Sequence, residues 1–153
     1  MEIELVVNGE AVTAEVEPQE LLLDFVRDDL RLTGAKRSCD VQVCGTCTVL
    51  VDGEPVSACT YLAAEADGRD VLTIEGFAQL PEFAAYESAF NRHGALQCGY
   101  CTPGFLLTIR ALKEAGQLGS EAEIRHGLDG NICRCTGYRA ILDAAREIAG
   151  VTR

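Results

Sequence analysis

Eight cysteines in this chain fall into two groups of four, and four thiolates are a donor set that can hold a metal centre. The first group reads C-x4-C-x2-C, and its fourth cysteine follows after 11 further residues. The second begins with C-x2-C and, after 31 residues, ends with C-x-C. C-x4-C-x2-C with a later fourth cysteine is the plant-type spacing of a 2Fe-2S cluster, so the pattern predicts electron transfer through two metal centres. The members are Cys39, Cys44, Cys47 and Cys59 in the first group and Cys98, Cys101, Cys133 and Cys135 in the second.

Zinc and disulfide bonds are the alternative uses of so many cysteines. Zinc sites usually carry C-x2-C at both ends, whereas here one group opens with C-x4-C and the other closes with C-x-C. Disulfides need an oxidising compartment, but the acidic start Met1–Leu5 lacks the basic residues of a secretory signal. We therefore predict a cytoplasmic protein with reduced thiols. Spacing favours iron-sulfur clusters, and a zinc-stabilised interaction module is the alternative.

We predict no histidine ligand in either group. Rieske ligation replaces two cysteines with two histidines, but neither His93 nor His126 lies beside a cysteine in that pattern, and we interpret both as surface or helix-end residues. Gly45 and Gly99 each follow a cysteine in a C-G-x-C unit, where glycine lets backbone N–H groups close on the sulfurs. No spacing justifies a catalytic triad or a carboxylate pair, so we predict no catalytic residue in this chain.

Charge and hydropathy exclude two classes of partner. The net charge is −11, from 13 basic and 24 acidic residues, which argues against nucleic acid because phosphate binding needs clustered Lys and Arg. No apolar run approaches the roughly 20 residues that a transmembrane helix needs. A content of 48% hydrophobic residues is ordinary for a globular chain.

The first cysteine group lies in a segment, residues 1–76, that predicts a small α+β domain of the plant-ferredoxin (β-grasp) type. Apolar and polar residues alternate on both sides of Asn8-Gly9 and again around Asp52-Gly53, and both dipeptides are strong hairpin signals. A helical spacing of apolar residues lies between the two hairpins. The predicted strands are residues 3–7, 12–16, 48–51, 56–58 and 71–74, and the predicted helix is 20–30.

The second group lies in a segment, residues 80–153, that predicts an all-α four-helix bundle, joined to the first domain by a linker at Gly76–Leu80. Thr102 followed by Pro103 predicts an N-cap, and Ser120 with Glu123 predicts a capping box. Both cysteine pairs of this group would then precede helices, whose N-terminal dipoles favour thiolate. We interpret three aromatic residues at helical spacing as core: Phe83, Tyr86 and Phe90.

Three segments carry a resemblance to a known family over nearly the whole chain. They are LTGAKRSCDVQVCGTCTVLVDGEPVSAC (32–59), LQCGYCTPGF (96–105) and GNICRCTGYRAI (130–141). With QCGYCTPG and CRCTGY in this order, the chain resembles the small 2Fe-2S subunit of the molybdenum hydroxylases, the xanthine oxidase family. The resemblance implies a plant-ferredoxin-like domain and a four-helix domain, each with one 2Fe-2S cluster.

The resemblance also implies partners and a route for electrons. A large subunit carries a molybdopterin (molybdenum) cofactor and oxidises the substrate, and a medium subunit carries FAD, in a heterotrimer or a dimer of heterotrimers. By position, the second cysteine group would lie on the molybdenum side and the first on the flavin side. Gln97 matches the family glutamine that contacts the pterin. A free-standing ferredoxin-like carrier, docking transiently, is the alternative.

The chain departs from the family at one position and leaves one surface to be explained. Gln42 stands where the loop between the first two cysteines usually carries glycine, which puts the loop's shape and its flavin contact in question. Binding to partner subunits requires exposed apolar surface around the cluster loops, for which we name four candidates. They are Val41, Val43, Tyr100 and Phe105, the last with core packing as its alternative.

Overall fold

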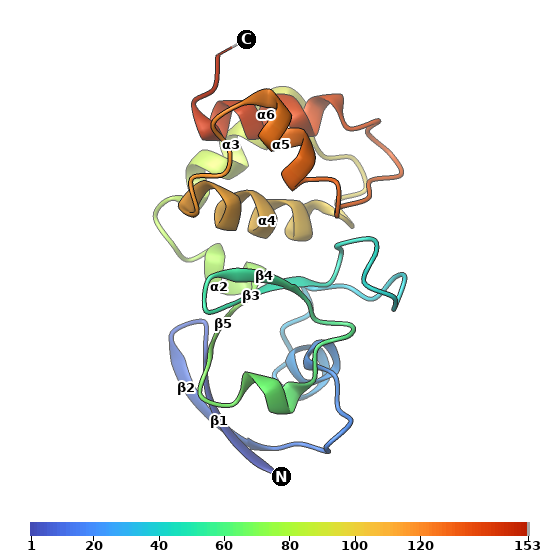
Figure 1. The fold of residues 1–153 in the computed structure, drawn as a ribbon, viewed down its shortest axis with the longest axis vertical. Helices are drawn as coiled ribbons and strands as arrows, with labels where there is room; N and C mark the ends of the chain where they lie inside the picture. The colour runs from blue at the N-terminus through green and yellow to red at the C-terminus, as the bar shows by residue number, and fades with distance from the viewer. Residues whose placement is uncertain (153) are drawn as a thin grey trace.

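The computed structural model describes residues 1–152 as a strand-rich half followed by a helical half (Figure 1). The N-terminus lies at the far end of the strand-rich half, and α6 (Arg139–Ala149) lies at the opposite end of the molecule. Helix α4 (Thr102–Glu114) lies at the boundary, where it packs on β3 (Thr48–Val51) and β4 (Glu54–Ser57). This order of elements confirms the predicted α+β chain, with strands first and helices second.

Strands within residues 1–152 form one mixed sheet in the order β2-β1-β5-β3-β4. β1 (Glu2–Val7) and β2 (Glu10–Glu15) form the first predicted hairpin, whose tight turn takes positive φ at Asn8 (54°) and Gly9 (84°). β3 and β4 form the second predicted hairpin. Buried side chains alternate along β1 with exposed ones, so one face of the sheet supplies the core of this half.

The helix predicted at 20–30 is present but mostly not α-helical. A single α turn, α1 (Leu22–Asp24), continues as a π-helical turn, η1 (Phe25–Asp29). The side chains of Leu22, Phe25 and Val26 are completely buried against the sheet. This packing holds the wider turn, and a short 3-10 turn follows β4 further along the chain, η2 (Ala63–Ala66).

The segment after the sheet differs from the prediction. β5 (Asp70–Leu72) runs parallel to β1 and antiparallel to β3, and it ends before the predicted strand end at Ile74. Ile74 instead begins a short helix, α2 (Ile74–Phe77). The predicted linker Gly76–Leu80 therefore starts inside a helix, and Phe77 is completely buried in the core of the helical half. Packed contacts, not a free connection, join the two halves.

The helical half contains α3 (Phe83–His93), α4, α5 (Glu121–Gly127) and α6, close to the predicted positions. Tyr86 and Phe90 are buried, as predicted, and the ring of Tyr86 lies edge-on to Phe77 at 5.0 Å between centroids. Phe83 is only partly buried and packs on the edge of the same core. Among residues 1–152, no helix is long and apolar enough to cross a membrane.

Two predicted helix starts have different outcomes. Ser120 caps α5, since its hydroxyl accepts a hydrogen bond from the N–H of Glu123 at 3.2 Å. The predicted capping box is only half formed, because the Glu123 carboxylate accepts from the Ser120 hydroxyl at 2.9 Å and not from its N–H. Thr102 was predicted as the cap of α4, which is wrong, because Cys101 occupies that position with helical dihedral angles and no side-chain cap. Pro103 lies in the first turn, where its missing N–H has no helical partner.

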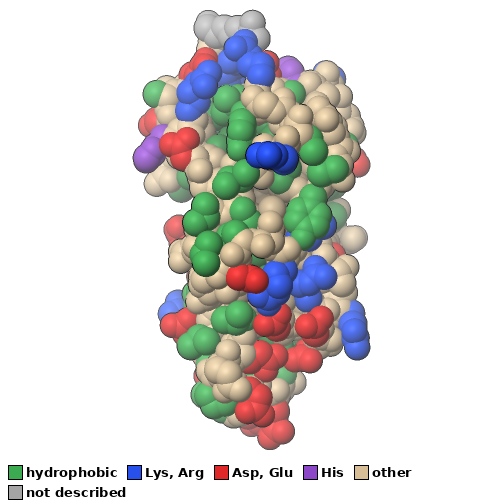
Figure 2. Space-filling model, turned by 90° about the vertical axis from the view of Figure 1, so that its right-hand side faces the viewer, with side chains coloured by type: hydrophobic (Ala, Val, Ile, Leu, Met, Phe, Trp, Pro, Cys, Tyr) green, Lys and Arg blue, Asp and Glu red, His purple; other side chains and the backbone are tan. Residues whose placement is uncertain are grey.

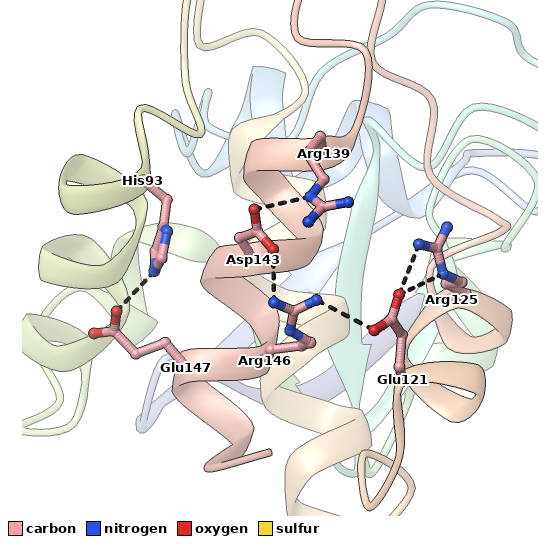
Figure 3. A network of polar contacts seen from close by, with 7 residues as sticks. All are labelled: His93, Glu121, Arg125, Arg139, Asp143, Arg146 and Glu147. Carbon is pink, nitrogen blue, oxygen red and sulfur yellow. Dashed lines mark hydrogen bonds and ion pairs between the residues drawn. The ribbon is translucent and has the colours of Figure 1, made fainter. Parts of the chain in front are cut away.

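Ion pairs tie α6 to its neighbours, as Figure 3 shows. The Oε2 atom of Glu147 in α6 lies 2.8 Å from Nε2 of His93 in α3. Glu147 also pairs with Arg92 of α3. On another side of α6, the nearly buried Arg146 pairs with Glu121 of α5 at 3.2 Å. These contacts hold the helix that follows the last cysteines against the rest of the half.

Candidate metal centres

Cysteines of both groups lie in loops on the same side of the molecule (Figure 1). The first group occupies the long loop between η1 and β3 and the turn after β4, and the second occupies the loops before α4 and α6. Figure 2 turns this side toward the viewer and shows hydrophobic side chains gathered across its middle. Acidic side chains gather toward the strand-rich end of the same face.

Within each group, the four thiols form two contacting pairs. In the second group, the sulfurs of Cys98 and Cys135 lie 3.5 Å apart, and Cys101 lies in hydrogen-bond contact with Cys133. In the first group, Cys39 contacts Cys44, and Cys47 contacts Cys59. Across residues 1–152, no three Cys, His, Asp or Glu side chains form the donor group of a single metal ion. The observed unit is a pair of thiols, and two such pairs make up each group.

Burial and hydrogen bonding divide the first group. Backbone N–H groups of Val41 and Val43 point at the Cys39 sulfur, the second at 3.4 Å, and lower the pKa of this thiol to about 6. Cys47 is only 2% exposed, and burial raises the pKa of its thiol to about 12. A cation bound to such a buried thiol deprotonates it, which an apolar environment alone does not do.

The second group also contains one thiol that accepts hydrogen bonds and one that is raised in pKa by burial. Burial raises the pKa of Cys133, but hydrogen bonds from the hydroxyl of Thr136 at 3.1 Å and from its N–H at 3.4 Å outweigh it, so the pKa lies below its usual value. Burial raises the pKa of Cys101 to about 12. Tyr138 supports the loop, because its hydroxyl accepts the N–H of Cys133 at 3.2 Å. Soft sulfur donors with N–H groups aimed at them fit an iron-sulfur cluster.

Gln42 has the backbone conformation for which glycine is suited. Its φ is 58°, in the left-handed region, as is that of Asp40 at 55°. Its side chain contributes little, since Oε1 only accepts a long hydrogen bond from the exposed hydroxyl of Thr60 at 3.4 Å. Gln42 therefore carries backbone strain in the left-handed conformation that it adopts in this loop.

Replacing Gln42 with glycine is expected to leave both metal centres intact and to stabilise the chain slightly. Relief of the left-handed strain gives about 1 kcal/mol, part of which the larger unfolded-state entropy of glycine offsets. The melting temperature should rise by up to about 3 °C. Gln42→Ala is the control, because it removes the hydrogen bond to Thr60 and keeps the strain. A lower melting temperature for Gln42→Gly would mean that the side chain supports the loop.

Large apolar side chains of the described residues are exposed mainly around the cysteines. Among residues 1–152, every large apolar side chain that is strongly exposed, apart from Met1, lies within three residues of a cysteine. Val41 is 65% exposed, Val43 55% and Tyr100 44%, as predicted, whereas Phe105 is 1% exposed and packs in the core, which was its alternative. The complete set, called the cysteine-side patch below, is Val41, Val43, Leu96, Tyr100, Ile132 and Tyr138.

The remaining predicted residues have the following surroundings. Gln97 is exposed beside Cys98. Gly99 has a φ of 78° and turns the N–H of Tyr100 toward the Cys98 sulfur, which lowers the pKa of that thiol. His93 lies at the end of α3 in its ion pair with Glu147, and His126 is exposed at the end of α5.

Sequence reasoning missed the contacts that join the two cysteine groups. The N–H of Ile132, which precedes Cys133, donates to the carbonyl of Cys44 at 2.9 Å. The hydroxyl of Tyr100 donates to the carbonyl of Arg37, which lies two residues before Cys39, at 2.5 Å. Both contacts join segments far apart in the chain, and no local pattern indicates them.

Two protein-family models match adjoining parts of the chain. A "2Fe-2S iron-sulfur cluster binding domain" matches residues 5–73, and a "[2Fe-2S] binding domain" matches residues 73–146. The two ranges contain the first and the second cysteine group, respectively. These matches support iron-sulfur clusters over zinc.

Curated relatives cover nearly the whole chain. The nicotine 6-hydroxylase small subunit of Paenarthrobacter nicotinovorans is 43% identical over 98% of this chain and 90% of its own length. The caffeine dehydrogenase subunit gamma of Pseudomonas sp. (strain CBB1) is 42% identical over 98% of this chain and 92% of its own.

Solved structures give the same result. A chain of quinoline 2-oxidoreductase from Pseudomonas putida 86 matches with a TM-score of 0.91 and 41% identity, over 98% of this chain and 94% of that one. The aldehyde oxidoreductase of Desulfovibrio gigas matches with a TM-score of 0.90 and 36% identity over 98% of this chain. Only 17% of that second chain is covered, so there the same fold is one part of a much longer polypeptide.

Proposed function

This chain belongs to the small iron-sulfur subunits of the xanthine oxidase family of molybdenum hydroxylases, and we propose that its eight cysteines set two 2Fe-2S clusters in line between two partner cofactors. It is an electron-transfer subunit of an oxidoreductase. The observation that carries the proposal is that both cysteine groups form paired thiols and belong to loops on one side of the molecule. A bound 2Fe-2S cluster supplies one-electron chemistry and needs four cysteine ligands.

We assign the ligands by group and by pair. The group in the strand-rich half, Cys39 with Cys44 and Cys47 with Cys59, would hold one cluster. The group in the helical half, Cys98 with Cys135 and Cys101 with Cys133, would hold the other. Each pair would take one iron, because the contacts between thiols are made within these pairs. N–H groups that already point at Cys39 and Cys133 stabilise thiolate at both sites.

The two sites would face different partners. We place the molybdopterin of a large subunit beside the helical-half group, where the thiols of Cys98 and Cys135 are exposed. Gln97, exposed beside Cys98, would present its amide to the pterin. We place the FAD of a medium subunit beside the strand-rich half, where Cys39 is the least buried cysteine of its group.

The cysteine-side patch would be the surface that these partners cover. Exposed apolar residues gathered on one face are typical of a binding surface. In the Desulfovibrio gigas protein the matched fold is part of a longer chain, which supports stable association with a larger body over transient docking. We propose a heterotrimer, or a dimer of heterotrimers, in the cytoplasm, with the chain divided into domains at 1–76 and 80–153. The two family models, which meet at residue 73, support a division into two domains, with the boundary a few residues earlier than the proposed one.

Substituting Val41 with lysine is expected to weaken binding of the partner subunits about tenfold and to leave both clusters loaded. Val41 is 65% exposed, so the change places a charge in the covered surface without disturbing the core. The measurement is the amount of large and medium subunit recovered with the tagged chain. Ala11→Lys, exposed on β2 away from the cysteines, is the matched control. Equal recovery with both variants would remove this surface from the proposal.

Electron paramagnetic resonance (EPR) of the dithionite-reduced protein, with iron, zinc and molybdenum analysis, tests the proposed function. We expect two distinguishable 2Fe-2S signals, about four iron per chain, and molybdenum in a larger co-purifying protein. About two zinc per chain and no signal would overturn the assignment in favour of structural metal. Two clusters in a chain that purifies alone would favour the free-standing carrier instead.

A further inference from the structure

The loops of the two cysteine groups meet at one buried place. The hydrogen bond from Ile132 N–H to the Cys44 carbonyl, at 2.9 Å, joins a ligand residue of the first group to the residue before Cys133 of the second. Only covalent bonds and this one hydrogen bond separate the Cys44 and Cys133 sulfurs along this path. The relative position of the two metal centres therefore depends on how firmly these loops are held together.

Asn131 lies at this junction. Its side chain is 5% exposed, and Nδ2 donates to the carbonyl of Gly45, the residue after Cys44, at 3.4 Å. A Cβ atom on Gly45 would come within 2.4 Å of this Nδ2 atom and within 2.6 Å of the Gly130 carbonyl oxygen. The amide thus fills the space that the absent side chain of Gly45 leaves.

The first turn of helix α4 also contacts this junction. A Cβ atom on Gly104, in the first turn of α4, would lie 2.0 Å from the Gly45 carbonyl oxygen and 3.5 Å from Asn131 Nδ2. Both cysteine loops and the start of α4, which follows Cys101, are therefore in contact around one amide group.

The Asn131 side chain is not needed as a hydrogen-bond donor for the Gly45 carbonyl. The Gly45 carbonyl already accepts the hydroxyl of Thr48 at 2.8 Å and its N–H at 3.3 Å. A carbonyl oxygen has two lone pairs, so these two donors suffice. What Asn131 adds is a bond between the two loops, across 86 residues of sequence.

We propose that Asn131 is a positioning residue that holds the two cluster loops at a fixed separation and so sets the coupling between the two iron-sulfur sites. The inference rests on the proposed function, because it concerns the same cysteines. Transfer between the sites moves one electron from one cluster to the other, with no bond formed or broken. Asn131 touches neither reacting centre and acts through the Ile132–Cys44 contact.

Hydrogen exchange at the Ile132 amide measures the junction directly. In Asn131→Ala and Asn131→Asp, we expect this amide to exchange about tenfold faster than in the parent, while the amide of Ile109 in the middle of α4 keeps its rate. Asn131→Asp is nearly isosteric, so it tests the lost donor even if the alanine variant does not fold. Asn91→Ala, exposed on α3, is the control and should change neither rate. Equal acceleration at both amides would indicate general destabilisation and overturn the proposal.

Magnetic interaction between the reduced clusters is the second measurement. Each reduced cluster broadens the EPR signal of the other, and this broadening weakens as the clusters move apart. The fully reduced Asn131 variants should therefore show both signals with less broadening than the parent and Asn91→Ala. Unchanged broadening, with both clusters loaded, would overturn the role of Asn131 and leave the proposed function standing. A parent protein without two iron-sulfur signals would instead overturn the proposed function itself.

Discussion

Replacing Cys135 with serine is expected to abolish the iron-sulfur signal of the helical half while the signal of the strand-rich half persists. Thiolate, not hydroxyl, is the iron ligand, and the Cys135 sulfur is the partner of Cys98 at 3.5 Å. Cys135 is exposed, so the change removes a ligand without opening the core. Turnover of the complete enzyme should fall more than about 100-fold, beyond the usual effect of outer-shell changes.

The reciprocal variant, Cys39→Ser, provides the matched control for this prediction. Cys39 is also only partly buried, and its loss should abolish the other signal and leave that of the helical half. Iron analysis should show about half of the parent's content in both variants. Unchanged turnover of Cys135→Ser with an artificial acceptor on the flavin side would contradict the order of the two sites. Loss of both signals in each variant would contradict two independent donor groups.

Local patterns were sufficient to predict most elements of the fold. The turn at Asn8-Gly9 is determined by its own dipeptide, since both residues take the positive φ that such a turn requires. Cysteine spacing likewise indicated two donor groups, which the family matches at 5–73 and 73–146 support. Ser120 capped a helix as expected, because the bond to Glu123 lies within a single turn.

Errors arose where tertiary packing decides the outcome. Phe77 was assigned to a linker, yet it is buried between the halves, where α2 meets the aromatic residues of α3. η1 has the apolar spacing of an α-helix, but its packing on the sheet holds it as a π turn. Asn131 belongs to the motif that carried the resemblance, but its partner Gly45 is 86 residues away and no spacing reveals it.

Gly45 and Gly99 form a matched pair, and replacing each with alanine is expected to separate two roles that the sequence made look alike. Both follow a cysteine in C-G-x-C, and both have positive φ, 70° and 78°. Alanine in this region costs about 1–2 kcal/mol at either position. Among the described residues nothing lies within 4 Å of a Cβ on Gly99, so strain is the whole cost there.

Gly45→Ala should be the more damaging change, because its Cβ would also lie 2.6 Å from a backbone oxygen, that of Gly130. Overpacking of this kind adds about 1–3 kcal/mol, for a total of about 3 kcal/mol. Melting temperatures of the loaded protein should therefore fall by roughly 9 °C for Gly45→Ala and by roughly 4 °C for Gly99→Ala. The broadening between the two reduced clusters should change only in Gly45→Ala, which pushes the loops apart.

A double variant decides whether the Gly45 effect acts through the junction. Truncation of Asn131 removes the contact at 2.4 Å but not the one with the Gly130 carbonyl, so Gly45→Ala with Asn131→Ala should be less destabilised than the sum of the two single changes. Gly99→Ala with Asn131→Ala should be additive, since no contact links those two positions among the described residues. Additive losses in both double variants would mean that the Asn131 amide contributes nothing to the cost of a side chain at Gly45, which would then come from the left-handed backbone and the Gly130 carbonyl.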